Sequence, residues 1–201
     1  MYLINGFFTG LGMIIFIGPV FFTLLQASFQ FGFQSGWAVA WGIVISDVLC
    51  VILCEIGFQA FFQNTQNQFY IGVAGVFLLV GMGLNYLFNP KLAQKTEIAL
   101  TSMDYIGFFI KGFLVNFVNP FVFLVWLGVI GQARENGGYE GQELYLFLFA
   151  TLIGIFFTDS LKAYFAHRIK SWINPQRLAL LYKMVGLLLC VFGLVLWFKI
   201  S

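Results

Sequence analysis

Residues 41–50 read WGIVISDVLC, a run of apolar and small side chains with one aspartate, Asp47, near its middle. The run lies inside a longer apolar stretch, 36–62, which exceeds the roughly 20 residues that a helix needs to cross a bilayer. An aspartate at the centre of such a helix costs roughly 2.5–3.5 kcal/mol on insertion scales. Ionisable residues in membrane segments mark functional sites by default, so Asp47 is predicted to be functional.

The composition of the whole chain places it in a lipid bilayer. Its 201 residues are 61% hydrophobic and only 9% charged, whereas a soluble domain carries about 25% charged residues. The net charge of +2 offers no basic face for nucleic acid, so we expect no nucleic-acid partner. The three cysteines fall in apolar runs, which argues against a disulfide framework. We therefore expect an integral membrane protein.

Six apolar windows can each cross a bilayer, and internal backbone pairing makes helices the natural form for them. They cover residues 4–29, 36–62, 69–88, 105–131, 143–166 and 180–199. The N-terminal window is too long for a cleaved signal peptide and is expected to remain as the first span.

Basic residues gather on one side of this predicted bundle. The loops between spans 1–2, 3–4 and 5–6, with the adjoining helix ends, hold Lys91, Lys95, Lys111, Lys162, Arg168, Lys170, Arg177 and Lys183, and the other side holds Arg134 and Lys199. Basic loops stay in the cytoplasm. We therefore expect a multi-pass protein of the cell inner (plasma) membrane with both termini outside the cytoplasm.

The motif around Asp47 occurs twice. Residues 42–47 read GIVISD and residues 154–159 read GIFFTD, which places Asp159 in span 5 as Asp47 is placed in span 2. Pro19 interrupts span 1 as Pro120 interrupts span 4, and spans 3 and 6 share a glycine-spaced pattern. This pattern indicates a duplicated three-helix unit, whose second copy must run the opposite way because three is odd.

The fold prediction is an all-α membrane protein of six transmembrane helices in two inverted three-helix repeats, with helices 1 and 4 broken or kinked at Pro19 and Pro120. It forms one transmembrane domain, 1–201, with repeat 1 at about 1–88, a linker at about 89–104 and repeat 2 at about 105–201. Inverted repeats with interrupted helices are typical of secondary transporters. The glycines Gly6, Gly10, Gly107 and Gly112 are expected to allow close helix packing.

The two proline breaks suggest where a substrate binds. Proline removes a backbone donor and leaves carbonyls free before the break, while N–H groups are exposed after it. Free N–H groups suit a carboxylate and free carbonyls suit an ammonium or a metal ion, so a zwitterionic amino acid fits. The substrate-binding candidates are Gly18, Pro19, Thr23, Gln26, Asn116, Asn119 and Pro120. Asn116 and Asn119 are expected to point the same way on span 4. Such polar residues also join helices to one another, and that alternative stays open for Thr23 and Gln26.

The acidic residues supply the candidates for ammonium binding or proton coupling. Asp47 and Asp159 can alternate between charged and neutral forms as access to the site switches. Lys162, one turn beyond Asp159, either neutralises it or extends to the cytoplasmic interface. Glu55, two turns beyond Asp47, lines an outer vestibule or marks the end of span 2. These two residues are secondary candidates.

A soft-metal site is the alternative for the same region. Cys50 and Cys54 share the Asp47 face of span 2, but two thiols and one carboxylate form an incomplete ligand set. We therefore expect no metal and no other cofactor. The short loops hold no nucleotide-binding motif and no nucleophile–base pair, so we do not expect an enzyme.

Four stretches carry a resemblance to a known family. They read GFFTGLGMIIFIGPV at 6–20, GIVISD at 42–47, KGFLVNFVNP at 111–120 and YKMVGLLLCVFGLVLWF at 182–198. In order and spacing they resemble the LysE/RhtB family of amino-acid exporters. The resemblance implies six spans and ion-driven export of amino acids or their derivatives from the cytoplasm, with protons as the expected ion.

The chain departs from this family at three places. Ile17 replaces the first proline of a usual Pro-Gly-Pro, Ser46 replaces the glycine before the span-2 aspartate, and Phe121 replaces a lysine that often follows Asn-Pro. These departures bear on the substrate rather than on the fold.

Three other functions compete with amino-acid export. A metal-ion exporter of the same superfamily would need more ligands than Asp47, Asp159 and the two thiols provide. A membrane electron carrier would need cysteines on spans 1 and 4, which have none. A purely structural membrane protein leaves the repeated acid and proline pattern unexplained. The sequence leaves the oligomeric state open.

Overall fold

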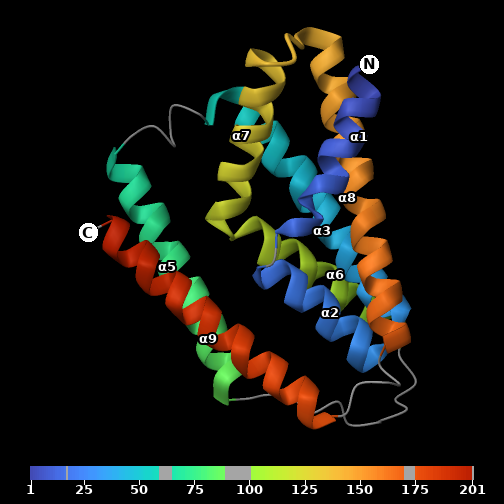
Figure 1. The fold of residues 1–201 in the computed structure, drawn as a ribbon, viewed down its shortest axis with the longest axis vertical. Helices are drawn as coiled ribbons and strands as arrows, with labels where there is room; N and C mark the ends of the chain where they lie inside the picture. The colour runs from blue at the N-terminus through green and yellow to red at the C-terminus, as the bar shows by residue number, and fades with distance from the viewer. Residues whose placement is uncertain (17, 59–64, 89–100, 170–174, 201) are drawn as a thin grey trace.

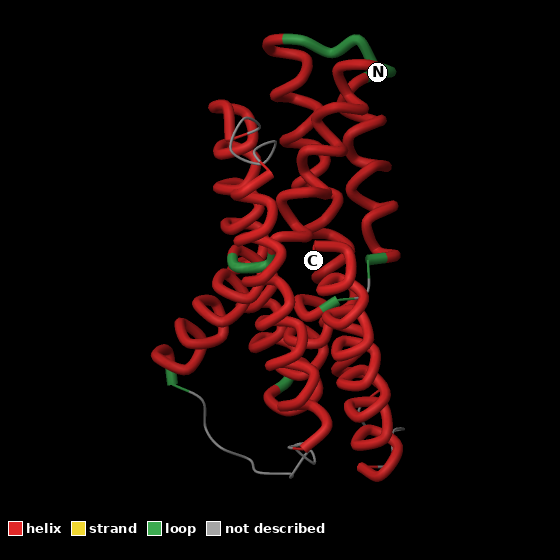
Figure 2. Tube along the Cα trace, turned by 90° about the vertical axis from the view of Figure 1, so that its left-hand side faces the viewer, coloured by secondary structure: helices red, strands yellow, loops and turns green. Residues whose placement is uncertain are grey.

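A computed structural model describes residues 1–16, 18–58, 65–88, 101–169 and 175–200 (Figure 1). Within these ranges the chain forms helices and short connections, with no strand (Figure 2). The elements are α1 (Tyr2–Gly12), the 3₁₀-helical turn η1 (Met13–Ile15), α2 (Pro19–Phe31), α3 (Phe33–Leu53), the π-helical turn η2 (Cys54–Phe58), α5 (Thr65–Phe88), α6 (Ser102–Phe117), α7 (Pro120–Glu135), α8 (Gly141–Ile169) and α9 (Pro175–Ile200).

The described helices differ in whether they are long and apolar enough to cross a membrane. Two of them can do so alone, Phe33–Ile56 and Gly141–Arg168, and two bent helix pairs raise the number to four if each pair is one span. Shorter apolar helical segments cover Gly75–Phe88 and Gly186–Val195. These apolar helices are those of a multi-pass membrane protein, and the full count of six spans stays a prediction.

Both bends lie at the predicted prolines. Tyr2–Ile15 meets Pro19–Phe31 at 80°, and Ser102–Phe117 meets Phe121–Glu135 at 68°. Pro19 and Pro120 are each the first residue of the second helix, where the missing N–H leaves no internal partner unsatisfied. The prediction that helices 1 and 4 break at these residues is confirmed.

Glycines bring two pairs of helices into close contact. Gly6 and Gly10 of α1 lie against the backbone of α8, and Gly112 of α6 lies against the backbone of α3 at Val39. A methyl group at any of these three glycines would overlap a backbone carbonyl of the partner helix. Gly107 is different, because a methyl group there would meet nothing within 4 Å. The expectation of close packing is confirmed for three of the four glycines and is wrong for Gly107.

The helices α5 and α9 form an antiparallel pair that is inclined to the rest of the bundle (Figure 1). Gly83 and Gly186 let their backbones approach closely. A buried cluster attaches this pair to the other helices, with Tyr86 and Leu189 packing against Phe29 of α2 and Ala166 of α8. The larger core lies elsewhere, around Trp126, between α3, α7 and α8.

Candidate functional site

Asp47 lies near the middle of α3, where only 4% of its surface is exposed. Two side chains donate hydrogen bonds to the same carboxylate oxygen, Oδ1. Asn116 Nδ2 lies 2.8 Å from it and Trp126 Nε1 lies 3.0 Å from it. The Asn116 amide also donates to Ser46 Oγ at 3.1 Å and to the Ile43 carbonyl at 3.3 Å. The buried carboxylate is thus held by donors that carry no charge.

The break in the fourth predicted span brings these two donors together. Asn116 belongs to the last turn of α6, and Trp126 lies in the second turn of α7. The bend of 68° between the two helices allows both to face α3. In a straight helix these two side chains would project in different directions, because ten positions separate them along the sequence.

Trp126 is a site residue that sequence analysis missed. Its side chain is 1% exposed, although tryptophans of membrane proteins usually lie at the water interfaces. A buried indole N–H needs an acceptor. The signal that could have identified Trp126 is therefore its place inside the fourth apolar window, 105–131, five residues before the window ends.

Asp159, on α8, is also buried but has a charged partner. Lys162 Nζ lies 2.9 Å from Asp159 Oδ1, and the lysine side chain is only 13% exposed. The same ammonium lies 5.8 Å from the ring centroid of Phe21 on α2. Lys162 was expected either to neutralise Asp159 or to extend to the cytoplasmic interface, and in the structure it forms the ion pair with Asp159. The two repeated acids therefore have different surroundings.

The predicted residues at the first break make internal contacts. The Thr23 hydroxyl is buried and donates to the Pro19 carbonyl at 2.9 Å, one turn earlier. Gln26 Oε1 accepts from Lys111 Nζ at 3.5 Å and links α2 to α6. Gly18 has an extended backbone, with φ −150° and ψ −170°, and precedes α2. As the N-cap residue of α2, Gly18 has no side chain to cap the first turn.

At the second break, Asn119 makes a different contact from Asn116. It is the residue before α7, and its Oδ1 accepts from the Phe121 N–H at 3.1 Å. The expectation that Asn116 and Asn119 point the same way is wrong, because the helix ends at Phe117 and the chain turns between them. Pro120 begins α7.

Glu55 lies in η2 and is away from the Asp47 cluster. Its Oε2 forms an ion pair of 2.9 Å with Arg134 Nη2, near the end of α7. The pair joins the end of the second predicted span to the end of the fourth. In this structure Glu55 therefore has the position of a residue that marks the end of a span.

The two cysteines beside Asp47 are buried in the apolar core. Cys54 Sγ lies 4.0 Å from the Phe123 carbonyl oxygen. Within the described ranges, no group of three or more His, Cys, Asp or Glu side chains is arranged to hold a metal ion.

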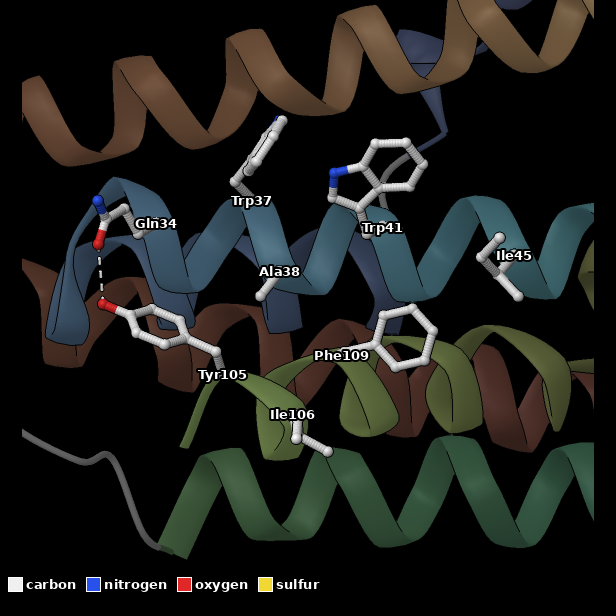
Figure 3. A pocket seen from close by; sticks show the side chains of 8 residues that line it. All are labelled: Gln34, Trp37, Ala38, Trp41, Ile45, Tyr105, Ile106 and Phe109. Carbon is white, nitrogen blue, oxygen red and sulfur yellow. Dashed lines mark hydrogen bonds between the residues drawn. The ribbon is translucent and has the colours of Figure 1, made fainter. Parts of the chain in front are cut away.

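A large groove lies on another face of α3, between α3 and α6 (Figure 3). Its volume is about 810 Å³. Trp37, Trp41 and Phe109 line it, and a hydrogen bond of 2.9 Å from the Tyr105 hydroxyl to Gln34 Oε1 lies at one end. This nearly continuous apolar lining suits lipid chains better than it suits a zwitterion.

Broken apolar helices around buried, hydrogen-bonded carboxylates are the architecture of a membrane transport protein. The sequence matches the family described as LysE type translocator over residues 11–199, so the chain belongs to this family. It is a family of transporters and not of enzymes.

One relative among curated proteins is the Bacillus subtilis (strain 168) protein described as "Putative amino acid efflux protein YcgF". The two are 27% identical over 126 residues, which cover 62% of this chain and 60% of the relative. The chain thus matches less than two thirds of that relative's length. No solved structure matches.

Proposed function

We propose that this protein is a secondary active transporter that exports amino acids or amino-acid derivatives from the cytoplasm. It works by proton-coupled alternating access in the cell inner membrane. Six spans form two inverted three-helix repeats, and both termini lie outside the cytoplasm. Membership of the translocator family and the description of the Bacillus relative as an amino acid efflux protein support this proposal.

The pairing of the helices supports the inverted repeat. Under an exchange of the two repeats, α1 corresponds to α6 and α3 corresponds to α8. The packing of α1 on α8 then has its counterpart in the packing of α6 on α3, and both contacts are close. The α5–α9 contact and the α3–α8 contact each join two corresponding helices, so the exchange leaves each of them unchanged.

The charge pattern supports the orientation only in part. Arg134 lies in the last turn of α7, which ends on the same side of the bundle as the N-terminus. Lys162 and Arg168 lie in the second half of α8, which runs to the other side (Figure 1). Lys91, Lys95 and Lys170 of the predicted cytoplasmic set lie outside the described residues, as does Ile17.

The observation that carries the proposal is the setting of Asp47. Neutral donors, Asn116 and Trp126, hold one of its oxygens beside the break of α6 and α7. Such a carboxylate has no fixed ammonium to release, so it can take up either a proton or the ammonium of a substrate. Asp159 already has the ammonium of Lys162 at 2.9 Å. We therefore assign proton coupling or ammonium binding first to Asp47.

The first turn of α2 supports a site for the other end of a zwitterion. Its N–H groups follow Gly18 and Pro19, and the N-cap residue Gly18 has no side chain to cap them. Free N–H groups at a helix start favour a carboxylate. The start of α7 differs, because Asn119 already accepts the Phe121 N–H there.

The test compares Asp47→Asn with the wild type in two assays. The first is growth of an expressing strain on toxic amino-acid analogues, and the second is amino-acid flux in proteoliposomes at several external pH values. We expect the variant to lose resistance and the pH dependence of flux. Asp104→Asn, the same exchange at an exposed carboxylate of the α6 cap, is the control. Resistance and a pH profile unchanged by Asp47→Asn, with equal protein abundance, would count against the proposal.

A further inference from the structure

A pocket of about 390 Å³ lies between the first half of one broken helix and the second half of the other. Thr9, Gly12 and Phe16 line it from the side of α1 and η1, and Gly128 and Gln132 line it from α7. Its volume falls within the range of about 300–1,000 Å³ that small-molecule sites occupy. Three of its lining residues, Met13, Val125 and Val129, also belong to or pack against the apolar core cluster that holds Trp126.

Two glycines keep this pocket open. A methyl group at Gly12 or at Gly128 would meet nothing within 4 Å. These glycines therefore differ from Gly6 and Gly10, which allow two helices to touch. A side chain at Gly12 or Gly128 would instead occupy empty space.

The corresponding place in the other half of the bundle is closed. The two prolines, Pro19 and Pro120, are 120 − 19 = 101 positions apart, so Gly12 corresponds to Phe113 and Gly128 to Ala27, which is buried.

There α2 packs against α6. The rings of Phe31 and Phe108 lie 5.0 Å apart, and Lys111 bonds to Gln26. The structure is thus open between α1 and α7 on the side of the N-terminus, and closed between α2 and α6 on the opposite side.

The pocket reaches the breaks of the two bent helices at Phe16, one of its lining residues. Phe16 is the last described residue before the first break, and Phe121 is the second residue of α7, directly after Pro120. Their rings meet edge to face with centroids 5.8 Å apart. A molecule in the pocket would therefore lie beside Phe16 and near both breaks.

The chemistry of the lining selects a class of substrate. Its walls are apolar, with Met13, Leu124, Val125 and Val129 beside Phe16, and its polar groups are the Thr9 hydroxyl and the Gln132 amide. None of the lining residues is charged. Transfer of a charged side chain into such a space without a partner is strongly unfavourable.

We infer that this pocket is the outward-facing compartment of the transport pathway and that it admits amino acids with an apolar, aliphatic or aromatic side chain. The inference rests on the proposed function. The polar Thr9 and Gln132 and the position beside the breaks favour the transported solute as occupant over a lipid chain.

The first experiment labels single added cysteines in intact cells with a membrane-impermeant thiol reagent. Gly128→Cys places a thiol in the pocket, and Gly131→Cys is the matched control on the same helix, where a side chain also meets nothing within 4 Å. The wild type, with its own three cysteines, gives the background. We expect Gly128→Cys to be labelled, with leucine and phenylalanine slowing the reaction and lysine and glutamate leaving it unchanged. Labelling of Gly131→Cys is expected to respond to none of the four.

Two labelling results would overturn the inference. If Gly128→Cys reacts only with a lipid-soluble reagent, the pocket faces lipid and not water. Equal protection by lysine or glutamate would remove the selection for apolar side chains.

The second experiment measures flux after the pocket is filled. Gly128→Leu should lower leucine and phenylalanine flux by about tenfold or more, the equivalent of 1.4 kcal/mol, whereas Gly131→Leu should stay close to the wild type. If the wild type transports leucine or phenylalanine and Gly128→Leu leaves that flux unchanged, the inference about the pocket is wrong. The proposed function would still stand. If the wild type moves no amino acid, the proposed function itself fails.

Discussion

Trp126 and Asn116 hold the same oxygen of Asp47 from two helices on either side of a break. A buried carboxylate needs donors, and a hydrogen bond to a charged group contributes about 1.5–3 kcal/mol. Because neither donor carries a charge, the carboxylate stays able to gain a proton without first separating from a counter-ion. This distinguishes Asp47 from Asp159, which is paired with Lys162.

The substitution Trp126→Phe tests the indole donor, because it removes the N–H and keeps an aromatic ring. The charged form of Asp47 loses one of its two hydrogen-bond donors, so the pH profile of flux should move toward higher pH. We expect a fall in flux at neutral pH of about tenfold, the equivalent of 1.4 kcal/mol.

The control is Trp41→Phe, which makes the same change at a tryptophan exposed in the groove of Figure 3. Both variants are measured in proteoliposomes at equal protein content. Identical pH profiles for Trp126→Phe and the wild type would show that the bond does not influence coupling.

The sequence could predict the acids but only one of their partners. Asp47 and Asp159 are conspicuous because each interrupts an apolar run, and Lys162 lies within one helical turn of Asp159. Trp126 is 79 positions from Asp47. Their contact depends on the 68° bend between α6 and α7, and no sequence pattern gives that angle.

Two glycines of α6 show how much helix packing depends on which face a residue occupies. Gly112 lies against the carbonyl of Val39 on α3, whereas Gly107 has open space where a side chain would be. Both glycines fit the same pattern of small residues in a membrane helix. The pattern indicates close packing in general, but the face that meets a partner depends on the rotation of the helix, which the sequence does not give.

The same substitution at these two glycines should therefore have opposite effects. Gly112→Ala places a methyl group against the α3 backbone, and overpacking of this kind costs roughly 1–3 kcal/mol. Gly107→Ala meets no neighbour and improves helix propensity by up to about 1 kcal/mol. We expect a lower midpoint of thermal unfolding in detergent for Gly112→Ala, and an unchanged or slightly higher midpoint for Gly107→Ala. Equal midpoints would contradict the close α3–α6 contact.

The breaks of the two bent helices were predictable to the residue because proline restricts the backbone locally. Pro19 and Pro120 each begin a new helix, as the loss of a backbone donor requires. The size of each bend was not predictable, since it depends on which helices pack against each half. The position of α5 and α9 likewise follows from packing at Phe29, Tyr86, Ala166 and Leu189.

The arrangement of the bundle as a whole combines a symmetric and an asymmetric feature. The α1–α8 and α3–α6 contacts are counterparts of each other under the proposed exchange of the two repeats. The places between α1 and α7 and between α2 and α6 are not equivalent, because the first holds a pocket and the second is packed. The proposed alternating access requires two states that exchange this difference. The closed pair, with Gln26, Phe31, Phe108 and Lys111, is then the contact that must separate when the site opens to the cytoplasm.

The proposed orientation leads to a test of the complete span count. Reporter fusions distinguish the two sides, since alkaline phosphatase is active only outside the cytoplasm and green fluorescent protein fluoresces only within it. With six spans and an external N-terminus, a phosphatase fused after Ser201 should be active and a fluorescent protein there should stay dark. A fluorescent protein fused after Ile169, at the end of α8, should be bright because five spans precede it. The basic residues near this point, Arg168 and Lys170, favour the cytoplasmic side. Fluorescence from the fusion after Ser201 would mean an odd number of spans, which would remove the inverted repeat, or the reverse orientation, which would overturn the proposed placement of the termini.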